Sequence, residues 1–202
     1  MSHPHLITDI DAAATFALAG RATFTVRNTA TGNHITFRID AVKGEDDLYE
    51  VRAFTGTENT RKDHYSVLGF IQGGQYTYRG MGAAVPELLE AATEADDEWL
   101  INFCKSMLRY QANGWDLSEK QVKSLVKNLR RNRIKVSAVS EDDPKAKGFA
   151  WVWKRLQARH PFPPSVQFWH EGRCGRCGRL LSNPDSIQRG LGPECAGLMA
   201  AA

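Results

Sequence analysis

Cysteine is scarce in this chain, because only four of its 202 residues are cysteines. So few cysteines do not build a disulfide scaffold, and clustered cysteines in a reducing compartment usually bind a metal. Cys104 stands alone, whereas Cys174, Cys177 and Cys195 lie close together near the C-terminal end. These three residues therefore indicate a metal site.

Long apolar runs are also missing, since no stretch approaches the roughly 18 consecutive apolar residues of a membrane span. The first residues, Met1-Ser-His-Pro-His, lack the basic and apolar regions of a secretion signal. With 42% hydrophobic and 24% charged residues, the composition is typical of a soluble globular protein. We therefore expect a cytoplasmic protein with no membrane partner.

The motifs of common enzyme classes are absent as well. The sequence has no phosphate-binding glycine-rich loop, no nucleophile elbow, no pair of helical histidines with a glutamate between them, and no acid cluster suited to two metal ions. We therefore assign no catalytic residue, and we expect a binding protein rather than an enzyme.

Apolar and polar residues alternate along residues 21–78, as in Ala22-Thr-Phe-Thr-Val and Ile35-Thr-Phe-Arg-Ile. This period of two, with β-branched and aromatic side chains, predicts about five short half-buried strands. Thr31-Gly32-Asn33 predicts a hairpin turn between the first two strands. The fold class that follows is α+β, with a small antiparallel sheet or a partly open barrel.

A helical period replaces this pattern near residue 99, and four regions result. We predict an antiparallel β domain at 1–80, an acidic linker at 81–98, an inserted basic helical hairpin at 99–135, and an aromatic helix with a metal-binding module at 136–202. The second helix of the hairpin should begin with a capping box formed by Ser118 and Gln121.

The cysteine spacing is that of a zinc knuckle, because glycine follows both Cys174 and Cys177 and lets backbone amides approach the sulfurs. Cys195 comes just after a proline that can start a helix. A structural zinc ion has four tetrahedral ligands, so three thiolates need one more. We predict one structural Zn²⁺ held by these cysteines and His170, which lies four residues before Cys174.

Several alternatives stay open for this cluster. Water or His160 could take the fourth position, and the thiols could also be buried without a metal. A redox disulfide is less suited to the sequence, because the Cys-x-x-Cys motif does not open a helix after a strand. A catalytic zinc would need an open position and a general base, for which Glu171 and Glu194 are the adjacent carboxylates.

The run His-Glu-Gly-Arg-Cys-Gly-Arg-Cys-Gly-Arg at 170–179, followed by Pro-Asp-Ser-Ile and Gly-Leu-Gly-Pro-Glu-Cys-Ala, resembles an uncharacterised zinc-motif family of bacteriophage and prophage proteins. The motif covers only the chain from residue 168 onward. More loosely, the N-terminal strands and the helix with Phe149-Ala-Trp-Val-Trp are similar to segments that accompany it. The resemblance implies a phage protein acting in the host cytoplasm, and it implies no biochemical activity.

Basic residues are concentrated although the formal net charge is only +3. The charges between 81 and 99 are all acidic, whereas those between 103 and 135 are mostly basic. Residues that could track a phosphate backbone are Lys120, Lys123, Lys127, Arg130 and Arg131 of the second helix, with Arg173, Arg176 and Arg179 of the zinc segment. Nucleic acid is the expected partner, and a host protein or ribonucleoprotein of the defence or transcription machinery is the alternative. An ordinary solvated helix face would explain the helix equally well.

Overall fold

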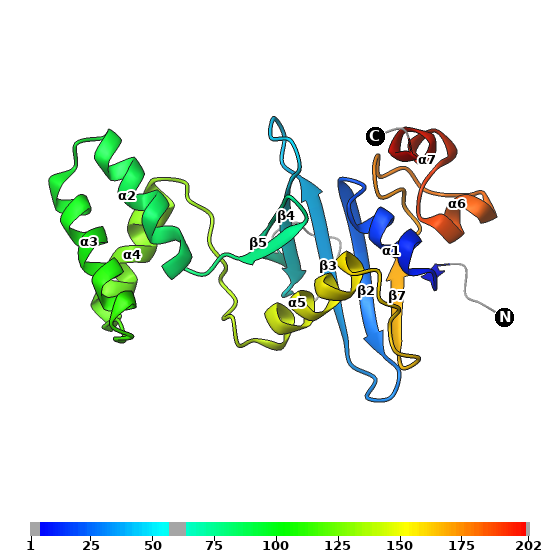
Figure 1. Cartoon of the computed structure of the whole chain (residues 1–202), viewed down its shortest axis with the longest axis horizontal. Coiled ribbons are helices and arrows are strands. Elements are labelled where there is room, and N and C mark those ends of the chain that lie inside the picture. The colour runs from blue at the N-terminus through cyan, green and yellow to red at the C-terminus, as the bar shows by residue number, and fades with distance from the viewer. Residues whose placement is uncertain (1–4, 57–63, 201–202) are drawn as a thin grey trace.

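The computed structural model describes residues 5–56 and 64–200, and one open antiparallel sheet lies at its centre (Figure 1). Its strands are β1 (Leu6–Ile7), β2 (Arg21–Asn28), β3 (His34–Ala41), β4 (Leu48–Phe54), β5 (Tyr65–Gln72), β6 (Gln75–Tyr78) and β7 (Val166–His170). Their order across the sheet is β1-β7-β2-β3-β4-β5-β6, so β1 and β6 are edges. The predicted α+β fold with an antiparallel sheet is confirmed, and the sheet does not close into a barrel.

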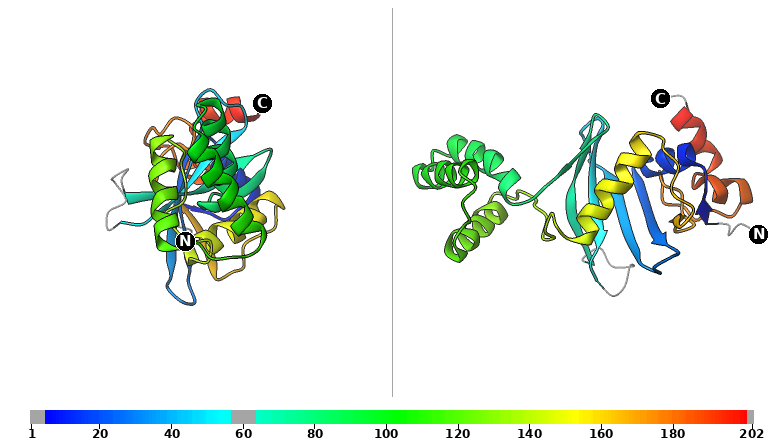
Figure 2. Two further views of the ribbon diagram at one scale, coloured as in Figure 1. Left: turned by 90° about the vertical axis from the view of Figure 1, so that its left-hand side faces the viewer. Right: turned by 60° about the horizontal axis from the view of Figure 1, so that its bottom comes forward.

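Alternation along the strands turns one face of the sheet, called here the core face, into the main core. Phe24, Phe37 and Phe168 point to this face and pack with α1 (Ile10–Ala17) and α5 (Pro144–Gln157). α5 crosses the sheet diagonally (Figure 2), and its Phe149 meets Phe37 edge to face with ring centroids 5.2 Å apart. The aromatic helix, expected together with the metal-binding module, is therefore part of the sheet's own core.

The opposite side of the sheet, called here the open face, carries the alternate residues of the same strands. At its centre lie Arg38 and Asp40 of β3 and Glu50 and Arg52 of β4, with an ion pair within each strand. Among the described residues, α1 and α5 pack on the core face, and α6 (Pro184–Arg189) contacts the edge strand β1. Polar strand positions are therefore left accessible on the open face.

Three helices inserted between β6 and α5 form a separate helical module, residues 82–134. They are α2 (Val85–Glu94), which follows the short 3-10 turn η2 (Gly82–Ala84), α3 (Glu98–Ala112) and α4 (Glu119–Arg131). Their apolar residues form a core of their own around Leu88, Met107 and Leu125. The capping box of Ser118 and Gln121 is present at the start of α4. Residues 81–98, expected as a linker, contain α2, whose buried side chains belong to this core.

Two chain segments that bond to each other connect the helical module to the sheet. The N–H of Ser137 donates to the carbonyl of Arg79 (2.7 Å), and Nε of Arg79 donates to the carbonyl of Lys135 (3.4 Å). The module projects at one end of the molecule, whereas α6 (Pro184–Arg189) and α7 (Pro193–Ala200) lie at the other end (Figure 1). In the described part of the chain, no helix has the length and apolar character needed to cross a membrane.

Candidate metal centre

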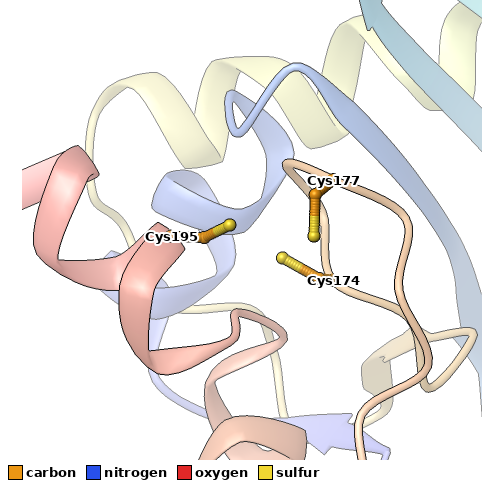
Figure 3. Close-up of side chains that lie close together, drawn as sticks. All are labelled: Cys174, Cys177 and Cys195. Atoms are coloured by element: carbon orange, nitrogen blue, oxygen red, sulfur yellow. The ribbon is translucent and has the colours of Figure 1, made fainter.

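The thiol groups of Cys174, Cys177 and Cys195 converge near the C-terminal end of the chain (Figure 3). Their sulfur atoms all lie within 4.8 Å of one another. Cys174 and Cys177 stand on a turn after β7, which the N–H of Gly178 closes by donating to the carbonyl of Cys174 (2.9 Å). Cys195 lies in the first turn of α7. The structure thus brings together the three cysteines that the spacing indicates, and they could hold a metal ion.

Backbone amides around the turn point to the sulfur of Cys174. Burial opposes ionisation of this thiol, but N–H groups of Cys177, Gly192 and Arg176 stabilise the thiolate and lower the pKa of Cys174 to about 7. Burial and the two neighbouring thiols raise the pKa of Cys195, while the Arg176 side chain hydrogen-bonds to its sulfur and acts in the opposite direction. Hydrogen bonds from the turn therefore favour the thiolate form at Cys174, and thiolate is the form of cysteine that binds metals.

The arrangement of the sulfurs fits a small tetrahedral cation. Zinc–sulfur bonds of about 2.3 Å in a tetrahedron place the sulfurs about 3.8 Å apart. Sulfurs already within 4.8 Å of one another need only a small contraction to reach that spacing. Cys174 and Cys195 are buried in a small cluster with Ala19 and Leu191, whereas Cys177 is exposed, so the site meets solvent on one side.

His170, predicted as the fourth ligand, lies outside the group of three thiols. Pairing of residue 170 with Phe24 across β7 and β2 turns the imidazole toward the core face, where it packs on Phe16 with ring centroids 5.6 Å apart. Nδ1 of His170 accepts a hydrogen bond from the N–H of Gly172 (3.0 Å). His160, the alternative, is exposed beyond the end of α5. The complete ligand set therefore stays a prediction, of which the structure assembles the three cysteines.

One aromatic ring joins the cysteine module, residues 171–200, to the sheet. Phe16 of α1 packs edge-on against Phe168 of β7 and also touches two glycines of the module. A Cβ on Gly175 would lie 2.9 Å from this ring, and a Cβ on Gly190 would lie 2.4 Å from it. Only residues without a side chain leave room for the ring. This role of Phe16 was not predicted from the sequence, although the glycines of the motif were a signal that something packs closely there.

The basic residues predicted to bind a partner lie in two separate places. Those of α4 are exposed on the helical module, and those of the cysteine module are exposed at the opposite end of the molecule (Figure 1). Lys123 forms an ion pair with Glu119 (2.5 Å), and Arg176 hydrogen-bonds to the sulfur of Cys195. Nη1 of Arg173 donates to the carbonyl of Gly178 (3.2 Å). The predicted residues therefore do not form one patch, because the sheet lies between them.

A polar pocket beside the cysteine module was not predicted from the sequence. It has a volume of about 250 Å³ and is lined by Arg21, Thr23, Arg38, Glu171, Arg173 and Gly178. The alternation of polar and apolar residues in β2 and β3 is enough to place Arg21 and Arg38 on the polar side of the sheet. Their meeting with Arg173 depends on β7 returning beside β2, which no local pattern reveals.

In comparison with known proteins, a family model matches a segment at the C-terminal end of the chain. No curated protein and no solved structure matches this chain. The matching segment includes the end of β7, the cysteine turn and both C-terminal helices, whereas most of the sheet and the helical module lie outside it. Residues 168–200 match DUF6011, a family of unknown function.

Proposed function

We propose that this chain is a non-enzymatic, phage-type accessory protein that binds nucleic acid and whose C-terminal module is stabilised by a structural zinc ion. The observation that carries the proposal is the basic stripe of α4, formed by Lys120, Lys123, Lys127, Arg130 and Arg131. At 3.6 residues per turn these five positions fall within an arc of about 100°. All five side chains are exposed, while Leu125 and Leu129 on the other side of the helix are buried.

This geometry suits a phosphate backbone better than an ordinary solvated face. Most surface helices mix charges of both signs, whereas Glu119 is the single acid of α4 and neutralises only Lys123. The last turn adds Arg130 and Arg131, which also interact favourably with the helix dipole. Ammonium and guanidinium groups in one row exchange counterions for phosphates, the main source of affinity for nucleic acid.

Zinc is the metal that the donor set favours. Thiolates are soft ligands, and three of them around one point are typical of zinc sites or of iron–sulfur clusters. A glycine-rich knuckle with amide-to-sulfur hydrogen bonds, in which one of the three thiols is exposed, supports a mononuclear site. Bound zinc would supply folding energy to the cysteine module, and it would fix Arg173 and Arg179 at the surface.

Charge reversal on α4 tests nucleic-acid binding. In the Lys123→Glu, Lys127→Glu, Arg130→Glu variant, we expect affinity for a fluorescein-labelled duplex or single strand to fall at least about tenfold. The slope of log K against log salt should become shallower by roughly 0.7 to 0.9 for each phosphate that the variant no longer neutralises. Fluorescence anisotropy at salt concentrations between roughly 50 and 200 mM measures both quantities.

The matched control has the same charge change at scattered exposed lysines, Lys43→Glu, Lys105→Glu and Lys154→Glu. It should bind nearly as well as the unaltered protein. Equal losses of affinity in both variants would mean that net charge, rather than the stripe, governs binding. Absence of binding to any nucleic acid at low salt would refute the proposal.

A protein partner is the second candidate, and an aromatic pair on α3 with an exposed tryptophan favours it. The rings of Trp99 and Phe103 are stacked with centroids 5.3 Å apart, and Trp99 remains 61% exposed. Asp96, Asp97 and Glu98 adjoin this pair, which suits a basic partner surface. If a host protein is the partner, Trp99→Ala should abolish its capture from lysate while α4 charge reversal leaves capture intact. If, in nuclease-treated lysate, the Trp99→Ala variant still captured the protein and the α4 variant did not, the aromatic pair would be excluded as the docking surface.

A further inference from the structure

We propose that the open face of the sheet is the path of a single strand of nucleic acid, running between the cysteine module and the base of the helical module. This proposal rests on the nucleic-acid binding proposed above and names both the class of ligand and the surface that holds it. It adds contacts from side chains that the basic stripe of α4 does not include.

The strand register fixes which side chains share the open face. One row across the strands contains Thr23 of β2, Arg38 of β3, Arg52 of β4 and Val67 of β5, which are directly paired neighbours. The next row contains Arg21, Asp40, Glu50, Phe70 and Thr77, again as paired neighbours from β2 to β6. Both rows run perpendicular to the strands. They therefore form a continuous track across the sheet.

Depressions lie at both ends of this track. The polar pocket of about 250 Å³ lies at the end beside the cysteine module. A larger cleft of about 750 Å³ lies at the other end, between the sheet and the base of the helical module. The cleft is lined by Leu48, Phe70, Gln72, Gly73, Gln75, Thr77, Arg79, Glu87, Arg133 and Lys135. The track therefore leads from one hollow to the other.

The charges along the track favour a polyanion. Its acids are mostly neutralised, since Asp40 pairs with Arg38, Glu50 pairs with both Arg52 and Lys135, and Glu87 pairs with Arg79. By contrast, three exposed arginines form no ion pair within the described residues, and they are Arg21, Arg133 and Arg173. The polar pocket also contains the carboxylate of Glu171, which lies near Arg38 and Arg173. Its arginines outnumber this acid three to one, so a net positive charge remains in the hollows at both ends, where phosphates would be received.

Aromatic side chains also lie on the open face, beside the track or in the cleft at its end. Trp169 of β7 is paired with Thr25 of β2 on the open face, and it is partly exposed. Farther across the sheet, Phe54 of β4 is paired with Tyr65 of β5, and their ring centroids lie 5.3 Å apart. Phe70 lies within the cleft. Every base has a π face that can stack on such rings, which a duplex with its bases already stacked cannot exploit.

The dimensions of the track also favour a single strand. Five intervals of about 4.8 Å separate β7 from β6, so the track is about 24 Å long. That length suits a site near the lower end of the roughly 4 to 16 nucleotides held by single-strand-binding folds. Bases presented to a sheet are unpaired, and sheet-based RNA-binding modules hold them in this way.

Charge reversal at the two hollows tests the path. We expect Arg21→Glu with Arg133→Glu to weaken binding of a labelled oligo-dT or oligo-U 20-mer at least about tenfold. Its salt dependence should become shallower by roughly 0.7 for each phosphate left without its arginine. The control, Lys105→Glu with Lys154→Glu, makes the same charge change away from the open face and should alter affinity less than about twofold. Circular dichroism verifies that both variants are folded.

A second variant separates stacking from charge. Trp169→Leu keeps an apolar side chain in β7, and it should weaken single-strand binding about fivefold or more while the salt dependence stays unchanged. The path would be refuted if the arginine and tryptophan variants bound with normal affinity while the α4 variant lost affinity. That result would still support the nucleic-acid binding proposed above. Stronger binding of the duplex than of either single strand would also refute the path. No binding of any probe by the unaltered protein would refute both proposals, and the DNA and RNA probes decide which single strand is preferred.

Discussion

Replacing Cys174 with serine is expected to release the metal and to unfold residues 171–200 while the sheet stays folded. Cys174 is 1% exposed and belongs to the smallest of the three buried clusters, whose five buried members include two of the thiols. So small a core does not hold a module together without a further constraint. In isolated zinc modules, metal binding contributes on the order of 10 kcal/mol of folding free energy.

The measurements are metal content by elemental analysis and hydrogen exchange of the backbone amides. Protection should vanish for the amides of Gly175, Gly178 and Leu181, which donate within the module, and it should persist along β2 and β3. A strong chelator should reproduce this pattern in the unaltered protein. Cys104→Ala is the matched control, since Cys104 is buried in the helical module and should not affect metal content. A Cys174→Ser protein that retained one full equivalent of metal would contradict the assignment.

Local patterns in the sequence were sufficient to predict most elements of the fold. The alternation around Phe24 and Phe37 predicts strands, and the capping box at Ser118 predicts where α4 begins, because each signal depends on neighbours within a few residues. Which elements pack together is not a local property. Phe149 is buried against Phe37 only because β7 and α5 return to the sheet after the helical module.

In the candidate site, too, some features follow from the local sequence and others depend on how distant segments pack. Cys174 and Cys177 share one turn, so their spacing alone predicts that both sulfurs meet. His170 is near them in sequence, but four residues of separation do not determine the direction of a side chain. That direction depends on the pairing of β7 with β2, which turns the imidazole toward Phe16. The open-face arginines were likewise visible as polar strand positions, while the sequence could not say which face the helices would cover.

Phe16→Ala is expected to have the second-largest effect, because this ring supports the sheet core and the cysteine module at once. It is 1% exposed and contacts Phe168 and His170, as well as the two module glycines. Removing a buried phenylalanine side chain costs about 3 to 5 kcal/mol of unfolding free energy. Denaturant titration should show this loss, and metal affinity measured against a competing chelator should fall as the module loosens. Phe16→Leu fills much of the space and should lose less of both.

A double-mutant cycle with Gly190→Ala shows whether the ring itself excludes a side chain there. Gly190 has φ +70°, so alanine is strained at this position in any background. With Phe16 present, the new Cβ would also lie 2.4 Å from the ring, and the module must shift. We therefore expect Gly190→Ala to cost clearly less in the Phe16→Ala protein than in the unaltered one, with a coupling energy of about 1 kcal/mol or more. Equal costs in both proteins would mean that the ring and the glycine act independently, and the cysteine module would then depend on its metal and its own small core alone.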